Sequence, residues 1–174
     1  MVGPALLCGW VPGWCCDGVM QMVLFQDVDR EATAAKVIEF FDKPLDHYLA
    51  MSGKHRADLR SPVSDGQPKG TPQGNATEDR MLAIWLANQI VDCVALAAQH
   101  CSDRAQKYLL GKYADRLDGR GLTEQLNFSA ATLSRHQLDA LNEFADRFEY
   151  QVIRRGLQNE VPDLHVKNEK IVQK

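Results

Sequence analysis

The sequence predicts an all-α fold made of N-terminal short helices, a linker, and a helical C-terminal domain with a helix-turn-helix. Three stretches, beginning near Asp29, Thr77 and Ser129, repeat apolar residues at the three- and four-residue spacing of an amphipathic helix. No stretch shows a convincing alternation of apolar and polar residues, which is the pattern of a strand. At 174 residues with 45% apolar content, the chain can supply a buried core.

The first residues differ from the rest because they are rich in Gly, Cys and Trp and carry almost no charge. We interpret residues 1–21 as a leader that is non-native or disordered; the alternative is a hydrophobic docking arm. An N-terminal helical module is expected over residues 22–60. Asp29 suits the N-cap of its first helix, and Pro44 ends that helix because proline cannot continue it. A second short helix is expected from Leu45 to Leu59.

A segment with three prolines and three glycines predicts a linker over residues 61–75. The predicted helix-turn-helix domain covers residues 76–156. It begins with the longest apolar pattern, a helix from Thr77 to about His100, and continues with a helix capped at Ser102. The remaining residues, 157–174, are expected to form a polar tail.

The pattern of a helix-turn-helix lies near the end of this domain. A short apolar helix, Leu122–Leu126, leads into a turn of three residues and then into a helix that runs to about Arg154. In the turn, Asn127 tolerates positive φ, Phe128 is expected to fix the turn to the core, and Ser129 can cap the second helix. An ordinary helical hairpin with no DNA-binding role fits the same pattern.

The first turns of the second helix carry the candidate DNA contacts. At about 100° per residue, one face turns away from Leu133. Four kinds of side chain lie on or beside that face. An arginine can bind guanine or phosphate, hydroxyls can bind phosphates or bases, small residues can contact thymine methyl groups, and a histidine can bind phosphate. These candidates are Arg135, Ser134, Thr132, Ala130, Ala131 and His136.

Charge limits how tightly one copy of this helix can hold DNA. The formal net charge of the chain is −3, and residues 129–148 carry two arginines against three acidic residues. Because phosphate attraction is local and depends on salt, we expect weak binding by a single copy. A homodimer or a contact with RNA polymerase would strengthen binding to double-stranded DNA.

From Met22 to about Tyr150 the chain resembles the ArpU family of phage transcriptional regulators. The resemblance depends on stretches at 29–37, 58–65, 68–81 and 122–148, of which the middle two are the most specific because no generic helix pattern requires them. It implies a C-terminal half similar to sigma-factor region four, with the six candidate residues above facing DNA. It also implies regulation of late phage genes for packaging and lysis.

The chain departs from the family motif in three ways. Asn127 stands where glycine is usual, Thr123 stands where a small alanine usually packs between the helices, and basic residues are sparse. The first two differences are compatible with the motif. The third again predicts weak DNA binding.

Other function classes find less support in the sequence. The histidines are scattered, and no HExxH, GxSxG or Walker-type motif is present, so we expect no enzyme and no cofactor. The five cysteines form no CxxC pair and no metal-finger spacing, which predicts reduced thiols in a cytoplasmic protein and no metal site. The family resemblance implies that this cytoplasm is that of a bacterial host. No run reaches the length of about 18 apolar residues that a membrane span needs, so the sequence predicts no span.

One alternative from another class stays open. A helical phage assembly protein, such as a small terminase subunit, or a polymerase-docking adaptor would share the same helical pattern. In that case the amphipathic helix 81–98 would be an oligomer interface instead of a core scaffold. The mass of the protein in solution distinguishes a large ring from a monomer or dimer.

Overall fold

The prediction of an all-α fold is confirmed. The computed structural model describes residues 28–60 and 75–168, and in these ranges the only β-type pairing is an isolated bridge between Val28 and Lys167. The predicted leader and almost all of the predicted linker lie outside the described residues. The elements are α1 (Arg30–Asp42), α2 (Pro44–Ser52), the 3-10 turn η1 (Arg56–Arg60), α3 (Asn75–Gln99), α4 (Asp103–Leu109), the π-helical turn η2 (Leu110–Ala114), α5 (Gly119–Leu126) and α6 (Ala130–Arg155).

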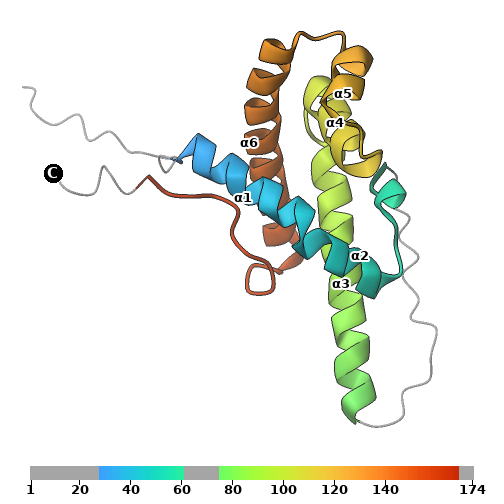
Figure 1. The fold of residues 1–174 in the computed structure, drawn as a ribbon. Helices are drawn as coiled ribbons and strands as arrows, with labels where there is room; N and C mark the ends of the chain where they lie inside the picture. Colours follow the sequence, from blue (N-terminus) through green and yellow to red (C-terminus); the bar gives the residue numbers. More distant parts are fainter. Residues whose placement is uncertain (1–27, 61–74, 169–174) are drawn as a thin grey trace, which may run out of the picture.

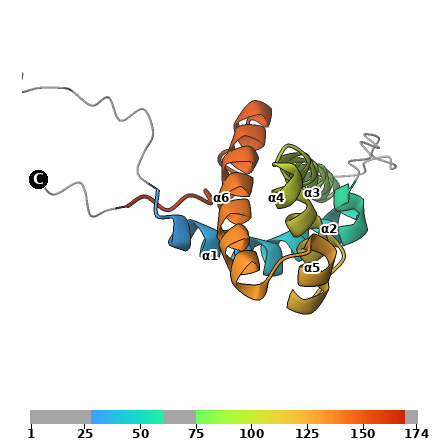
Figure 2. The ribbon, with the colours of Figure 1, turned by 90° about the horizontal axis from the view of Figure 1, so that it is seen from above.

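Two long helices, α3 and α6, form the frame of the molecule and lie side by side (Figure 1). Helix α1 crosses α6, and the chain then turns into α2, which packs on α3. Figure 2 shows α4 and α5 on the same side of α6, where α5 leads into the first turn of α6. The junction of α5 and α6 therefore lies beside the helices that form the core.

The boundaries of the first two helices follow from their cap residues. The Asp29 carboxylate accepts hydrogen bonds from the backbone N–H groups of Glu31 and Ala32, at 3.1 and 3.0 Å, which confirms the predicted cap. Pro44 occupies the first turn of α2, where its missing N–H costs nothing. The single helix predicted over residues 45–59 is wrong, because Gly53 adopts a left-handed conformation with φ of 69° and ends α2.

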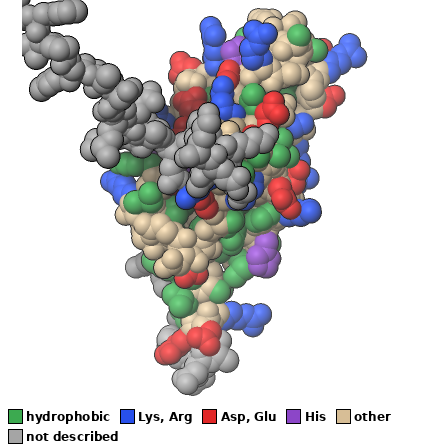
Figure 3. All heavy atoms as spheres, turned by 90° about the vertical axis from the view of Figure 1, so that its left-hand side faces the viewer, with side chains coloured by type: hydrophobic (Ala, Val, Ile, Leu, Met, Phe, Trp, Pro, Cys, Tyr) green, Lys and Arg blue, Asp and Glu red, His purple; other side chains and the backbone are tan. Residues whose placement is uncertain are grey.

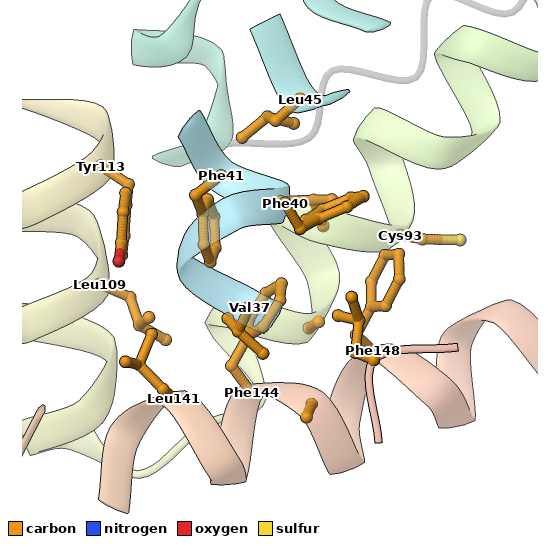
Figure 4. Packing of buried hydrophobic residues seen from close by; sticks show 14 of the residues in the cluster. Val37, Phe40, Phe41, Leu45, Cys93, Leu109, Tyr113, Leu141, Phe144 and Phe148 are labelled. Carbon is orange, nitrogen blue, oxygen red and sulfur yellow. The ribbon is translucent and has the colours of Figure 1, made fainter. Parts of the chain in front are cut away.

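A cluster of aromatic rings from α1, η2 and α6 forms the centre of the core (Figure 4). Phe41 of α1 stacks on Tyr113 with ring centroids 3.9 Å apart and also contacts Phe144 of α6 at 4.8 Å. Phe40 contacts Phe148 at 5.2 Å. The helices on both sides of the predicted linker therefore contribute to one core.

Helix α5 approaches the preceding helical segment closely at a glycine. A Cβ atom on Gly111 of η2 would lie 2.9 Å from Leu122 Cδ2 and 2.7 Å from Gln125 Oε1. The absence of a side chain at this position lets α5 pack directly on η2. Leu122 is buried at this contact, as the sequence pattern predicts.

A buried carboxylate joins three parts of the fold. The Asp92 side chain of α3 is 8% exposed and accepts a hydrogen bond from Lys54 Nζ at 2.6 Å. Arg155 Nη1, at the end of α6, lies 3.8 Å from the same carboxylate and 2.7 Å from Gln89 Oε1. Because a buried charge is costly without partners, this group of contacts holds α6 and the α2–η1 turn against α3.

The segment after α6 packs on the core, which the expectation of a polar tail did not include. Leu157, Val161 and Leu164 are buried. The chain then runs back to α1, where the Asp29 N–H donates to the Val166 carbonyl at 2.8 Å and the Val166 N–H donates to Thr33 Oγ1 at 3.1 Å. Residues 157–168 thus belong to the folded body.

Helix α3 extends beyond the other helices at its N-terminal end (Figure 1). Leu82, Ile84 and Trp85 are 56%, 41% and 50% exposed there. By length and composition alone, residues Thr77–Gln99 form a helix that could cross a membrane, and half of its apolar stretch is buried inside the protein. The core helix of a soluble protein can have the same length and composition. The expected absence of a membrane partner stays a prediction.

Candidate nucleic-acid interface

Helices α5 and α6 are joined by the turn that the sequence predicts. Asn127 adopts φ of 54° and ψ of 43°, a left-handed conformation that asparagine tolerates better than most residues. Ser129 takes the N-cap position of α6, and its Oγ accepts a hydrogen bond from the Thr132 N–H at 3.2 Å. The roles predicted for Asn127 and Ser129 are confirmed.

The first turns of α6 stand clear of the core. None of residues 130–139 is buried, whereas Ala140 and Leu141 are 2% and 0% exposed. Leu133 and Leu138 are half-buried and pack against the edge of the core. The beginning of α6 is thus held on one side and open to solvent on the other, whereas its later turns form part of the framework.

The six candidate DNA contacts lie in the first two turns of α6, at this open end. Four of them are exposed: Ala130, Ala131, Ser134 and Arg135. The other two, Thr132 and His136, are half-buried. Among the described residues, Arg135 makes no ion pair or side-chain hydrogen bond, so its guanidinium is available to a ligand.

Two of the candidate hydroxyl groups already have local partners. The Thr132 and Ser129 hydroxyl oxygens lie 2.8 Å apart at the helix cap. Ser134 Oγ donates to the Ala130 carbonyl at 3.2 Å, one turn earlier in the helix. Each hydroxyl can still accept a hydrogen bond, but neither is as free as the guanidinium of Arg135.

Phe128 does not fix the turn to the core, and this part of the expectation is wrong. The ring is half-buried and stacks on the imidazole of His136, with centroids 4.6 Å apart and planes 14° apart. The stack joins the turn to the second turn of α6. It therefore positions His136 beside the open face, where the phosphate contact was predicted.

The charges around this end are mixed (Figure 3). Arg120 of α5 lies 3.4 Å from Glu124, one turn later in the same helix, and both side chains are largely exposed. On α6, Asp139 lies one turn after Arg135 and forms an ion pair with Arg30 of α1 at 2.6 Å. Within residues 130–139 of α6, Arg135 is the only arginine or lysine, in agreement with the weak binding expected from the charge count.

Contacts from other elements hold α6 behind its open end. Asn142 Nδ2 donates to the Arg30 carbonyl at 3.0 Å, which ties the start of α1 to α6. Glu143 accepts from the Ser102 N–H at 2.6 Å and from its hydroxyl at 2.8 Å, which ties α6 to the start of α4. Ser102 thus occupies the predicted cap position, but its hydroxyl bonds to α6 and not to its own helix.

Sequence reasoning did not identify Arg30, Gly111 or the Phe128–His136 stack as parts of this end of the molecule. Arg30 is 109 residues from Asp139 in the chain, and no helical period relates them. Comparisons with protein-family models, with curated proteins and with solved structures find no match for this chain. The resemblance to the ArpU family stays a prediction.

Proposed function

We propose that the protein binds double-stranded DNA and regulates transcription, with the first turns of α6 in the major groove. The observation that supports this most directly is an open helix end whose exposed face carries Arg135, which has no ion pair or side-chain hydrogen bond with the residues that the structure describes. The end is held by its cap, its turn and its contacts to α1 and α4, so that little order has to be gained when DNA binds. The resemblance in sequence favours late phage genes as the regulated targets.

The backbone at the start of α6 also suits a phosphate. The first N–H groups of a helix have no partner inside that helix, and the helix dipole places partial positive charge there. Ser129 satisfies the Thr132 N–H, and the small side chains of Ala130 and Ala131 leave the remaining N–H groups open to an approaching anion. Phosphate contacts of this type orient a helix on DNA, while Arg135 can discriminate bases.

The test is selection of DNA duplexes from a random pool, followed by binding titrations of the enriched duplex. We expect Arg135→Ala to weaken binding by about 1–3 kcal/mol and to relax the sequence preference at one position. Arg154→Ala is the matched control, because it removes the same charge from an exposed position at the opposite end of α6. Equal binding by the wild type and both variants would contradict the proposal.

A helical assembly protein is the second candidate, and the exposed apolar side chains of α3 favour it. Leu82, Ile84 and Trp85 lie on the projecting end of that helix, where a second copy could cover them. Light scattering distinguishes the two functions. A large ring supports an assembly protein such as a small terminase subunit, whereas a monomer or dimer supports the regulator.

A further inference from the structure

The face of α6 that continues from Arg135 is acidic, which would oppose DNA. Asp139 follows Arg135 by one turn, so the two side chains share this face. Asp146 and Glu149 follow on later turns. An unpaired carboxylate beside Arg135 would repel the phosphates that the arginine is placed to meet.

Side chains from outside α6 meet each of these acids. Arg30 Nη2 lies 2.6 Å from Asp139 Oδ1. His165, on the segment after α6, places Nε2 2.9 Å from Asp146 and Nδ1 3.6 Å from Glu149. The acid nearest to the open end is therefore the one paired with an arginine, whose charge persists at any pH of interest.

We propose that Arg30 is a second cationic contact for the DNA backbone and that it also neutralises Asp139. This inference rests on the proposed DNA-binding function of α6. The Arg30 side chain is 58% exposed, and its contact with Asp139 uses Nη2. Among the described residues Nε and Nη1 make no hydrogen bond, so the guanidinium can bind the carboxylate and a phosphate at the same time.

The backbone of Arg30 is held by contacts that do not involve Asp139. Arg30 is the first residue of α1, after the Asp29 cap, and its carbonyl accepts from Asn142 Nδ2 at 3.0 Å. The guanidinium therefore stays about one helical turn from the Arg135 position, on the same face of α6. DNA that meets Arg135 then passes Arg30 on its way along α6, and two residues far apart in the chain form one cationic edge.

The test compares salt dependence of binding for a labelled duplex of random sequence, measured by fluorescence anisotropy over a series of KCl concentrations. Loss of one phosphate contact lowers the slope of log K against log salt by about 0.9. We expect Arg30→Gln to lower the slope by that amount. Asp139→Asn keeps the arginine and removes its acidic partner, so its binding should equal or exceed that of the wild type.

Three results would overturn the inference. If Asp139→Asn loses as much affinity as Arg30→Gln, the ion pair only holds α1 on α6. If Arg30→Gln keeps the wild-type slope while Arg135→Ala weakens binding, Arg30 touches no phosphate and the proposed function still stands. If the wild type binds the duplex no better than Arg135→Ala at low salt, the proposed function fails and this inference fails with it. Circular dichroism melting of each variant controls for unfolding.

Discussion

Truncation of Leu164 tests whether the segment after α6 is a structural part of the fold. Leu164 is 3% exposed, although it lies in a stretch whose sequence is polar overall and suggests a tail. Replacing a buried leucine with alanine lowers the free energy of unfolding by about 2–5 kcal/mol, depending on how well the site can collapse. Leu164→Ala should therefore destabilise the whole protein and not merely loosen its end.

A neighbouring cavity narrows the range expected for the loss in free energy of unfolding of Leu164→Ala. A cavity of about 190 Å³ lies between α6 and this segment, and Phe148, Val152, Val161 and Leu164 contribute to its wall. A side chain beside an existing void has fewer contacts to lose than one that is packed on all sides. We therefore expect about 2–3 kcal/mol, in the lower half of the usual range.

Leu82→Ala is the matched control because it makes the same chemical change at a position that is 56% exposed. Its effect on the free energy of unfolding should be about 0.5 kcal/mol or less. Urea unfolding followed by circular dichroism measures both variants, and the dependence on urea should keep the wild-type slope. If the two variants differ by less than about 0.5 kcal/mol, residues 157–168 do not pack as described and the reasoning is refuted.

Three further predictions concern the buried ion cluster, a buried thiol and the turn before α6. Asp92→Ala leaves a lysine and an arginine without their shared carboxylate, so chemical unfolding should show a loss of about 3–5 kcal/mol. Lys43→Ala, which breaks an exposed pair, should cost under about 1 kcal/mol, and similar losses in both variants would contradict this reasoning. Burial raises the pKa of Cys93 to about 11 from an ordinary 9.0, so the folded state keeps its proton where the unfolded state loses it. The protonated Cys93 thiol makes its full contribution to the free energy of unfolding below about pH 9, and this contribution falls by about 2–3 kcal/mol as the pH rises to about 11. Under reducing conditions, the free energy of unfolding of Cys93→Ala should fall less than that of the wild type between about pH 8 and about pH 10.5. An equal fall in both proteins would count against a buried protonated thiol. At Asn127 the positive φ predicts that Asn127→Gly unfolds at nearly the wild-type urea concentration, whereas Asn127→Val loses about 1–2 kcal/mol; equal midpoints would rule out strain at this position.

Local structure was the part of the fold that the sequence predicted well. The caps at Asp29 and Ser129 and the left-handed turn at Asn127 follow from the chemistry of single residues and their immediate neighbours. The apolar residues Ala140, Leu141 and Phe144 of α6 recur at helical spacing in the sequence, and all three are buried. The division of one predicted helix at Gly53 shows the limit, because the pattern of apolar residues continues across that break.

Contacts between distant parts of the chain could not be predicted in the same way. Leu164 reads as part of a polar tail until α6 and α1 provide the surface that buries it. Phe128 is apolar and lies close in sequence to core residues, yet its ring stacks on the imidazole of His136. In both cases burial depends on which surfaces the fold brings together, and periodicity says nothing about that.

The candidate site likewise has one part that follows from local helical geometry and another that follows from tertiary packing. The sequence by itself determined that α6 begins at Ala130 with a cap at Ser129, and that Arg135 and its neighbours share its first turns, because helical geometry relates residues three and four apart. Only the tertiary structure decided that these turns stay open, that Arg135 has no partner among the described residues, and that Asp139 is neutralised by Arg30 from 109 residues away. Ion pairing depends on distance in space, and only the packing of α1 across α6 sets that distance.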